Sequence, residues 1–399
     1  MKKIAMLLVL CIFAFGVYSC KDADNPATPP PTPVQVTDSS AIDSLVLAFM
    51  SKYNIPGGSV TMAKNGNTVY SKGYGIQDPL NTLVTDQSLF RLASCSKPFT
   101  AVGIMQLVQN GQLNLNDNVF GADGILNQPE YSNIIDPQIL NITVQNLLNH
   151  TGGWNDDTDS TNDPMFMSVQ IADSENVSAP AMQQSIITYV LSHMPLDFPP
   201  GTQYAYSNFG FCVLGRVIEK VTGMNYENYI RTKILVPSGI TAMQLGKNLL
   251  ANRFPGEVTY YGTSGEMTTT SVYGTGAIVP WPYAGFNIEA MDAHGQWIAS
   301  TSDLMKFLQA VRNNTLISQT IYNMMITVPA GVPNTNYACG WASNGNAIWH
   351  NGSLPGTSTE YVIANNGFSW ALVFNKRSGD NQLGTDLDNL GWNIQPFIH

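Results

Sequence analysis

Residues 91–98 read Arg-Leu-Ala-Ser-Cys-Ser-Lys-Pro and open a predicted helix that continues to Gly111. Ser94 and Lys97 are three residues apart, so their side chains leave the same helical face within one turn and Oγ and Nζ come into hydrogen-bonding range. A serine hydroxyl becomes a nucleophile when a base takes its proton, and a lysine whose pKa is lowered by burial can be that base. A serine that caps a helix and a lysine that is exposed to solvent would produce the same sequence. This stretch alone therefore fits both a catalytic pair and a purely structural role.

Two later segments carry side chains suited to the same chemistry. Residues 206–208 read Tyr-Ser-Asn and stand before a predicted helix from Phe209 to Val221, which puts a phenol and an amide on a helix-entry loop. Residues 349–353 read Trp-His-Asn-Gly-Ser and lie on a predicted strand. Read singly, the first segment fits turn chemistry and the second a hydrogen-bonded strand histidine. Read together with the serine and the lysine, they favour catalysis.

The three motifs S-x-x-K, Y-x-N and H-x-G, in this order, resemble those of the serine β-lactamase and penicillin-binding-protein family, nearest to its class C, D,D-peptidase and esterase branch. Residues 147–153, 215–223 and 299–304 are similar to further segments of that family, and the likeness spans about residues 40–380. The resemblance implies an α+β fold with three layers, α/β/α. In this β-lactamase/D,D-peptidase-like fold, helices flank an antiparallel sheet built from both chain ends, and a mainly helical lobe is inserted.

The resemblance also implies a catalytic role for three residues. Ser94 would attack the substrate carbonyl and become acylated, and Lys97 would accept its proton or keep Tyr206 poised. Tyr206 would pass the proton to the leaving group and later activate water. Because a phenol has an ordinary pKa of about 10, we expect the positive charge of Lys97 to lower the pKa of Tyr206.

Substrate binding is implied for a second set of residues. Asn208 would hydrogen-bond the amide or ester side chain of the substrate. His350 and Gly352 would belong to the strand beside the substrate. The backbone N–H groups of Ser94 and of Ser353, on what we expect to be an edge strand, would form the oxyanion hole.

The third motif departs from the lactamase pattern. Class C β-lactamases carry K-T-G, whereas this chain has His350, whose unperturbed pKa of about 6.5 leaves it mostly neutral at neutral pH. A neutral imidazole attracts a substrate carboxylate less than an ammonium does, so we expect weak lactamase activity. We favour a D-amino-acid peptide, as cleaved by a D,D-carboxypeptidase or D-aminopeptidase, or a small ester. The alternatives are a β-lactamase with a class C-like mechanism and a non-catalytic surface lipoprotein that binds cell-wall peptides.

Both chain ends carry strand signals, and the middle is mainly helical. Asp38 is a plausible N-cap for a helix through Lys52, and residues 57–75 read as an antiparallel hairpin around an Asn-Gly turn. Residues 336–378 hold several short strands, of which residues 370–374 suit a central strand. The predicted divisions are an α/β lobe of about residues 38–90 and 291–399 and a helical lobe of about residues 91–290.

The first residues of the chain read as an export signal. Lys2 and Lys3 precede a short apolar run, which predicts a signal peptide over residues 1–19. Residues 17–20, Val-Tyr-Ser-Cys, resemble the lipobox of bacterial lipoproteins, in which the cysteine, here Cys20, becomes the lipidated first residue; an incidental cysteine is the alternative. Residues 20–37 are proline-rich and predict an extended tether. We expect a lipid anchor on Cys20 that binds the outer membrane of the bacterial cell envelope, on its periplasmic or cell-surface side.

The composition of the chain restricts the classes of binding partner that we expect. The chain has 18 Lys+Arg against 28 Asp+Glu, a formal net charge of -10 and no dense basic stripe, so we expect no nucleic-acid partner. The hydrophobic share of 44% with 12% charged residues excludes a disordered chain. No dinucleotide fingerprint, P-loop or metal-ligand spacing is present, so we expect no cofactor and no metal site.

Cys95, Cys212 and Cys339 are interpreted as buried free thiols, and one disulfide among the three stays open as an alternative. We expect a monomer.

Two irregular segments are candidates for substrate selection. Residues 154–179 are acidic, with Asp156, Asp157, Asp159 and Asp163, and read as a solvated rim loop in preference to a calcium loop. Residues 253–290 hold six aromatic residues that suit either a core or the wall of a cleft: Tyr260, Tyr261, Tyr273, Trp281, Tyr283 and Phe286.

Overall fold

The computed structural model describes residues 35–155, 163–265, 267–333 and 335–399. The predicted signal peptide, Cys20 and most of the predicted tether lie outside these residues. Val34–His399 form one compact unit. Within the described ranges, no helix combines the length and the apolar character that crossing a bilayer requires.

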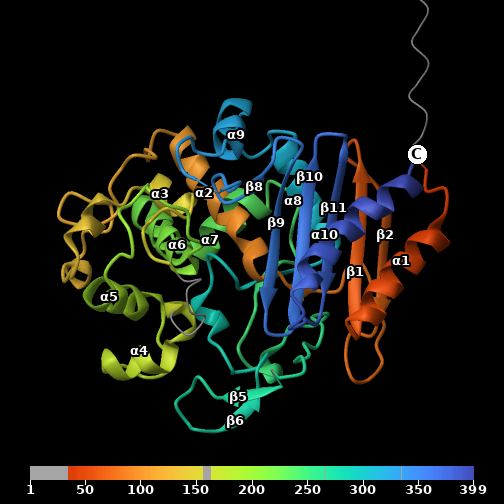
Figure 1. The fold of residues 1–399 in the computed structure, drawn as a ribbon, viewed down its shortest axis with the longest axis horizontal. Coiled ribbons are helices and arrows are strands. Elements are labelled where there is room, and N and C mark those ends of the chain that lie inside the picture. The colour runs from red at the N-terminus through yellow and green to blue at the C-terminus, as the bar shows by residue number, and fades with distance from the viewer. Residues whose placement is uncertain (1–34, 156–162, 266, 334) are drawn as a thin grey trace, which may run out of the picture. The chain divides into compact units, whose positions relative to one another are not determined.

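A six-stranded antiparallel sheet, drawn at the right of Figure 1, joins the two ends of this unit. Its order is β2-β1-β11-β10-β9-β8, so strands from the start and the end of the unit are neighbours, with Val60 of β1 opposite Leu372 of β11. The prediction of one sheet from both chain ends is confirmed. The strands span Gly57–Lys64 (β1), Asn67–Gly75 (β2), Ala342–Ser343 (β8), Ala347–Leu354 (β9), Thr357–Ala364 (β10) and Phe368–Phe374 (β11).

Local sequence signals account for the first two elements. The helix α1 (Ser39–Lys52) begins after Asp38, whose side chain accepts a hydrogen bond of 2.9 Å from the Ala41 N–H. The hairpin of β1 and β2 turns at Asn65 and Gly66, and both have positive φ, as a two-residue hairpin turn of this kind requires. The predicted helix and the predicted hairpin are confirmed.

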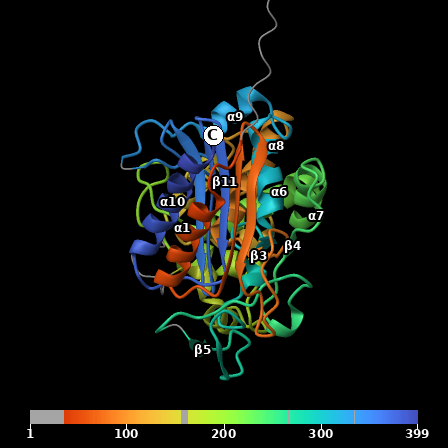
Figure 2. The same ribbon diagram turned by 90° about the vertical axis from the view of Figure 1, so that its right-hand side faces the viewer.

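The central strand β11 supplies side chains to both faces of the sheet. Trp370, Leu372 and Phe374 pack on one face against α1 and α10 (Gln382–Ile394). Ala371 and Val373 pack on the other face in the core that includes α8 (Thr301–Arg312). Figure 2 shows α1 and α10 together on one side of the sheet. The alternation follows from the two-residue period of a strand and gives the three-layer α+β fold that the sequence predicts.

The segment between the sheet strands forms a second, mainly helical part, drawn at the left of Figure 1. Its helices are α2 (Lys97–Gln109), α3 (Val144–Leu148), α4 (Ser168–Ser174), α5 (Gln183–His193), α6 (Asn208–Thr222) and α7 (Tyr226–Ile230), and α9 (Gln319–Ile326) follows α8. Two small sheets accompany them, formed by β3 (Phe90–Arg91), β7 (Trp297–Ala299) and β4 (Gln244–Leu245), and by β5 (Thr268–Thr270) and β6 (Ile278–Pro280).

Candidate active site

Ser94 lies on a short turn that differs from the predicted helical start. It belongs to the 3₁₀ helix η1 (Ala93–Ser96), and α2 begins only at Lys97. Ala93, directly before the serine, has φ of 48°, a left-handed conformation that non-glycine residues avoid. Such a conformation persists only where the surroundings fix it, and it is a feature of functional sites.

Side chains of β10 fix the backbone of this turn from the sheet side. Thr357 Oγ1 donates to the Arg91 carbonyl at 2.9 Å, and Thr359 Oγ1 donates to the Leu92 carbonyl at 2.7 Å. Tyr361 donates its hydroxyl hydrogen to the Cys95 carbonyl at 2.8 Å. The position of the serine therefore depends on a strand that follows it by more than 250 residues in the chain.

Lys97 is the centre of the polar site. Its side chain is fully buried, and Nζ donates to Ser94 Oγ at 3.0 Å, to Tyr206 OH at 2.5 Å and to Asn208 Oδ1 at 2.8 Å. The structure thus brings together four residues that the sequence singles out, from η1, α2 and the entry to α6. A hydroxyl that touches both an amine and a phenol has a route by which its proton can leave, as acyl transfer requires.

Tyr206 is held by the local structure of the α6 entry. Ser207 caps α6 by accepting a hydrogen bond of 3.2 Å from the Gly210 N–H, and the Tyr206 ring lies against the buried His150 ring with centroids 4.4 Å apart. Burial raises the pKa of Tyr206 well above its ordinary value, and the hydrogen bond with Ser94 offsets only part of this. Our expectation of a lowered pKa was wrong, because desolvation by burial is the largest influence on this phenol. The resting site therefore holds a neutral phenol.

Gly352 lets β9 approach the nucleophile turn closely. A Cβ at this position would lie 2.3 Å from the Leu92 carbonyl oxygen and 2.4 Å from Thr359 Oγ1. The close approach puts Ser353 into the cleft that Ser94 also lines. The strand β9 was predicted to lie at the edge of the sheet. On the side away from β10 it has a neighbour only at its start, where β8 pairs with Ile348 and Trp349 and not with the residues that follow them.

His350 lies in the strand as predicted, but its ring is not in the cleft. Nδ1 contacts the Asn351 carbonyl at 2.6 Å and Nε2 contacts the Tyr337 hydroxyl at 2.8 Å. A ring that donates to a carbonyl through one nitrogen and accepts from a phenol through the other is neutral. Burial lowers the pKa of His350 to about 3. The imidazole is absent from the cleft wall, to which its neighbours Asn351 and Gly352 contribute. His350 was predicted as a substrate-binding residue, and its strand does border the cleft, but its own ring does not line it.

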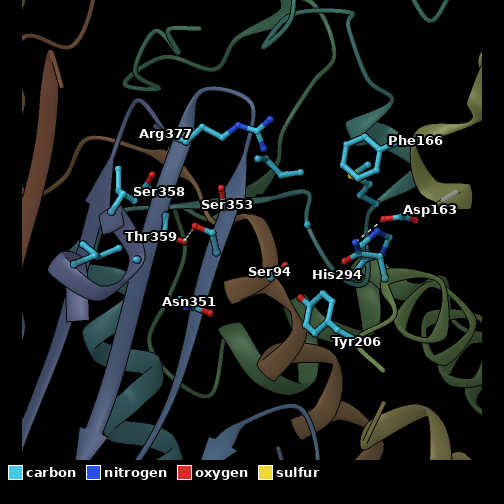
Figure 3. A pocket seen from close by; sticks show the side chains of 18 of the residues that line it. Ser94, Asp163, Phe166, Tyr206, His294, Asn351, Ser353, Ser358, Thr359 and Arg377 are labelled. Atoms are coloured by element: carbon cyan, nitrogen blue, oxygen red, sulfur yellow. Dashed lines mark hydrogen bonds between the residues drawn. The ribbon is translucent and has the colours of Figure 1, made fainter. Parts of the chain in front are cut away.

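The cleft has a volume of about 710 Å³ and opens over Ser94 (Figure 3). Its walls come from the α6 entry, β9, β10 and the start of α10, and from the segments around residues 163–166, 281, 291–295 and 377. A pocket of this size suits a small ligand. Within the described part of the chain, His, Cys, Asp and Glu side chains form no group of three or more that could hold a metal ion.

Asp163 corrects the interpretation of the acidic segment. The sequence suggests a solvated rim, yet Asp163 is only 6% exposed and lines the cleft. Its Oδ2 accepts a hydrogen bond of 2.8 Å from Asn208 Nδ2, and its Oδ1 accepts one of 2.9 Å from the Met165 N–H. Asp156, Asp157 and Asp159 lie outside the described residues. No spacing in the sequence signals this burial, because it depends on packing against α6.

The aromatic segment divides between the core and the cleft. Tyr260 and Tyr283 are buried around the Arg91 guanidinium, whose carbon lies 4.2 Å and 5.4 Å from the two ring centroids. Trp281 lines the cleft, as does His294, which no motif singles out. Both interpretations of the segment therefore hold, each for different residues.

The three remaining cysteines are free and buried. Burial raises the pKa of Cys212 to about 12 and that of Cys339 to about 11. The three thiols are therefore separate, and none forms a disulfide with another. Cys95 lies beside the nucleophile, and its thiol donates a hydrogen bond of 3.2 Å to the His350 carbonyl.

The fold and the arrangement of the site are of the β-lactamase and penicillin-binding-protein type. The chain belongs to the Beta-lactamase family, whose model matches residues 42–390. Protein flp of Staphylococcus aureus is 27% identical over 342 residues, which cover 83% of this chain and 61% of that protein. Penicillin-binding protein 4* of Bacillus subtilis is 29% identical over 325 residues, which cover 76% of this chain and 64% of that protein. The match thus spans less than two thirds of either relative.

A solved structure supports the fold. The D-amino acid amidase of Ochrobactrum anthropi SV3, in a complex with L-phenylalanine amide, superimposes with a TM-score of 0.69 at 22% identity. The superposition covers 89% of this chain and 98% of the amidase.

Proposed function

We propose that the protein hydrolyses an amide or ester through an acyl-enzyme on Ser94. The observation that carries this proposal is the contact of Lys97 Nζ with Ser94 Oγ, Tyr206 OH and Asn208 Oδ1 at 3.0, 2.5 and 2.8 Å. A lysine in ordinary structural use stays at the surface, because burying an ammonium is costly. A fully buried lysine next to a serine hydroxyl at the wall of a cleft favours nucleophilic catalysis.

The chemistry follows in two steps. Ser94 Oγ bonds to the substrate carbonyl carbon while its proton passes to Lys97 in its unprotonated amine form, and the backbone N–H groups of Ser94 and Ser353 receive the oxyanion. The bond to the leaving group breaks, and the neutral phenol of Tyr206 donates the proton that the departing amine or alkoxide takes up. Water then attacks the acyl-enzyme, loses a proton to the Lys97 and Tyr206 pair, and Ser94 regains its hydrogen.

We propose a D-amino-acid peptide or amide, or a small ester, as substrate in preference to a β-lactam. Support comes from the third motif, where the lysine of a class C lactamase is replaced by a neutral histidine whose ring faces Tyr337. The names of two similar proteins, a penicillin-binding protein and a D-amino acid amidase, fit this preference. The alternative is a β-lactamase, and nitrocefin turnover as fast as that of a dedicated lactamase would favour it.

The nucleophile is tested by covalent labelling. A fluorescent fluorophosphonate or penicillin should label the wild-type protein at one site, and Ser94→Ala should not be labelled. Ser96→Ala is the matched control, because Ser96 is a buried serine two residues away that does not line the cleft. Equal labelling of wild type and Ser94→Ala would exclude Ser94, and no labelling of the wild type would favour the non-catalytic binding protein.

We further propose a monomer that is lipid-anchored through Cys20 in the bacterial cell envelope. The support is the sequence alone, from the apolar run before Cys20 and the proline-rich residues after it. A fatty-acid analogue supplied to cells should label the wild-type chain and not Cys20→Ala, and light scattering of the protein without residues 1–37 should give the mass of one chain. Labelling of Cys20→Ala or a larger mass would contradict the respective proposal.

A further inference from the structure

Tyr206 stands in a segment without regular secondary structure. Residues 204–207 belong to no helix or strand, and α6 begins only at Asn208. The phenol nevertheless contacts Lys97 at 2.5 Å, and Figure 3 shows its hydroxyl directed toward Ser94. A catalytic group has to be held within about 0.5 Å of its working geometry. Contacts from another part of the chain must therefore fix this segment.

His150 supplies such contacts on both sides of the tyrosine. The Ala205 N–H donates to the His150 carbonyl at 2.9 Å, and the Ser207 N–H donates to His150 Nδ1 at 3.1 Å. Between these two hydrogen bonds, the His150 ring packs against the Tyr206 ring with centroids 4.4 Å apart. One residue thus holds the residue before Tyr206, the residue after it and the aromatic ring itself.

The backbone of His150 is itself fixed in the turn that follows α3. Its φ of 55° is a left-handed conformation, which is uncommon outside glycine. The His150 N–H donates to the Leu147 carbonyl at 3.4 Å, and the Thr151 N–H donates to the Asn146 carbonyl at 2.8 Å. A strained conformation of this kind persists where neighbouring contacts determine it, and such conformations cluster at functional sites.

The His150 ring is neutral, with its hydrogen on Nε2. Because Nδ1 accepts from the Ser207 N–H, the hydrogen of a neutral imidazole must be on the other nitrogen. Burial and the charge of Lys97 lower the pKa of His150 well below its ordinary value. The ring therefore holds the segment around Tyr206 without taking part in proton transfer at neutral pH.

Stability alone does not account for a histidine at this position. Nε2 is buried without a hydrogen-bond partner in the described protein, and such an atom costs free energy. The ring packs against the rings of Tyr206, Tyr337 and Phe211, with centroids 4.4, 4.5 and 5.2 Å away. A phenylalanine would pack against the same rings without that cost, but it would have no acceptor for the Ser207 N–H. The acceptor at Nδ1 is thus what distinguishes the histidine.

We propose that His150 is the positioning residue for the proton donor, because its grip on Ala205 and Ser207 keeps the Tyr206 hydroxyl where the leaving group can take its proton. This inference rests on the proposed function, in which Tyr206 protonates the leaving group. It implies a selective defect when His150 is changed. A misplaced phenol slows cleavage when the leaving group needs a proton to depart, and it has little effect when the leaving group departs as a stable anion. The contact of Lys97 with Ser94 does not involve His150.

Two esters of N-acetyl-D-alanine test this selectivity, because they share one acyl group. p-Nitrophenolate departs as a stable anion, whereas methoxide has to take up a proton. The measured quantity is the ratio of kcat/KM for the methyl ester to kcat/KM for the p-nitrophenyl ester. Because the same folded molecules hydrolyse both esters, this ratio does not depend on the fraction of the protein that is folded. Tyr206→Phe is the reference, and its ratio should fall well below that of the wild type.

Two substitutions of His150 separate the hydrogen bond from the ring. His150→Asn places Oδ1 where Nδ1 lies, and asparagine tolerates a left-handed backbone. His150→Gln also removes the ring, but it carries its amide one bond further out. A displacement of about 1 Å at a catalytic group can cost about 100-fold, so the ratio should fall by about 10- to 100-fold in His150→Gln. His150→Asn should restore much of it, and His193→Gln, on the exposed surface of α5, is the control.

The outcomes distinguish this inference from the proposed function. A wild-type ratio in His150→Gln together with a lowered ratio in Tyr206→Phe would overturn the inference, as would equal ratios in the asparagine and glutamine variants. A wild-type ratio in Tyr206→Phe, or a wild type that hydrolyses neither ester, would contradict the proposed function and the inference with it. If His150→Gln does not fold, NMR of isotope-labelled histidine in the wild type tests the hydrogen bond directly. Nε2 should be protonated and Nδ1 not, and the opposite tautomer or a doubly protonated ring would overturn the inference.

Discussion

Replacement of Gly352 by alanine is the sharpest test of how the sheet positions the nucleophile. The new Cβ would lie 2.3 Å from the Leu92 carbonyl oxygen, and real Cβ contacts are not shorter than 3.0 Å, so the two backbones must separate by at least about 0.7 Å. Leu92 stands two residues before Ser94, and a displacement of about 1 Å at a catalytic group can lower the rate by about 100-fold. We therefore expect kcat/KM to fall by about 100-fold, or about 2.7 kcal/mol of transition-state stabilisation.

The assay for Gly352→Ala compares the rate of fluorophosphonate labelling and the steady-state hydrolysis of a p-nitrophenyl ester with the wild type. Thermal unfolding is measured in parallel, because overpacking costs about 1–3 kcal/mol. Gly379→Ala is the control, since nothing lies within 4 Å of a Cβ at that position. Activity of Gly352→Ala within threefold of the wild type, with unchanged unfolding, would refute the account of this close approach.

Four further predictions concern single groups. Lys97→Met should lower kcat/KM by about 100- to 10,000-fold, measured by ester hydrolysis, because it removes the amine that contacts Ser94 and Tyr206. Tyr206→Phe should keep the ring contact with His150, and hence the melting temperature, but slow hydrolysis by about 100-fold; unchanged rates would remove the phenol from the mechanism. The pKa of His350 is lowered on folding to about 3 from the ordinary value of about 6.5, so the unfolded chain binds one more proton between these pH values. His350 should therefore contribute a loss of stability of about 1.4 kcal/mol per pH unit as the pH drops below about 6.5, and urea unfolding at several pH values should show a shallower dependence in His350→Gln. Ellman's reagent should titrate the buried Cys95, Cys212 and Cys339 only after denaturation.

Short-range signals were sufficient for much of the sheet. The Asp38 cap and the turn at Asn65 and Gly66 act through neighbouring residues, so they can be predicted from the sequence alone. The apolar run from Trp370 to Phe374 likewise identifies a central strand, because only such a strand is buried on both faces.

Properties that depend on distant packing were not predictable. Asp163 is buried because the loop that carries it packs against Asn208, and nothing in its own neighbourhood of the sequence signals this. The pKa of Tyr206 is raised by burial beneath segments far away in the chain. The ring of His350 faces Tyr337, whereas the next residue, Asn351, lines the cleft, so the prediction was one residue from the cleft wall. A motif therefore indicates which strand borders the site, but the face of the strand depends on register.

Because β1 pairs with β11, the six-stranded sheet can form only after β11 has been synthesised. Val60 can pair with Leu372 only after both have been synthesised. A ribosome that adds about 5–20 residues per second takes about 15–60 s to make the chain between them. Thr357, Thr359 and Tyr361, which fix the turn at Ser94, begin to be made about 13–53 s after Ser94 at the same rate. A chain that stops before β10 would hold the serine, the lysine and the tyrosine and yet lack a positioned nucleophile.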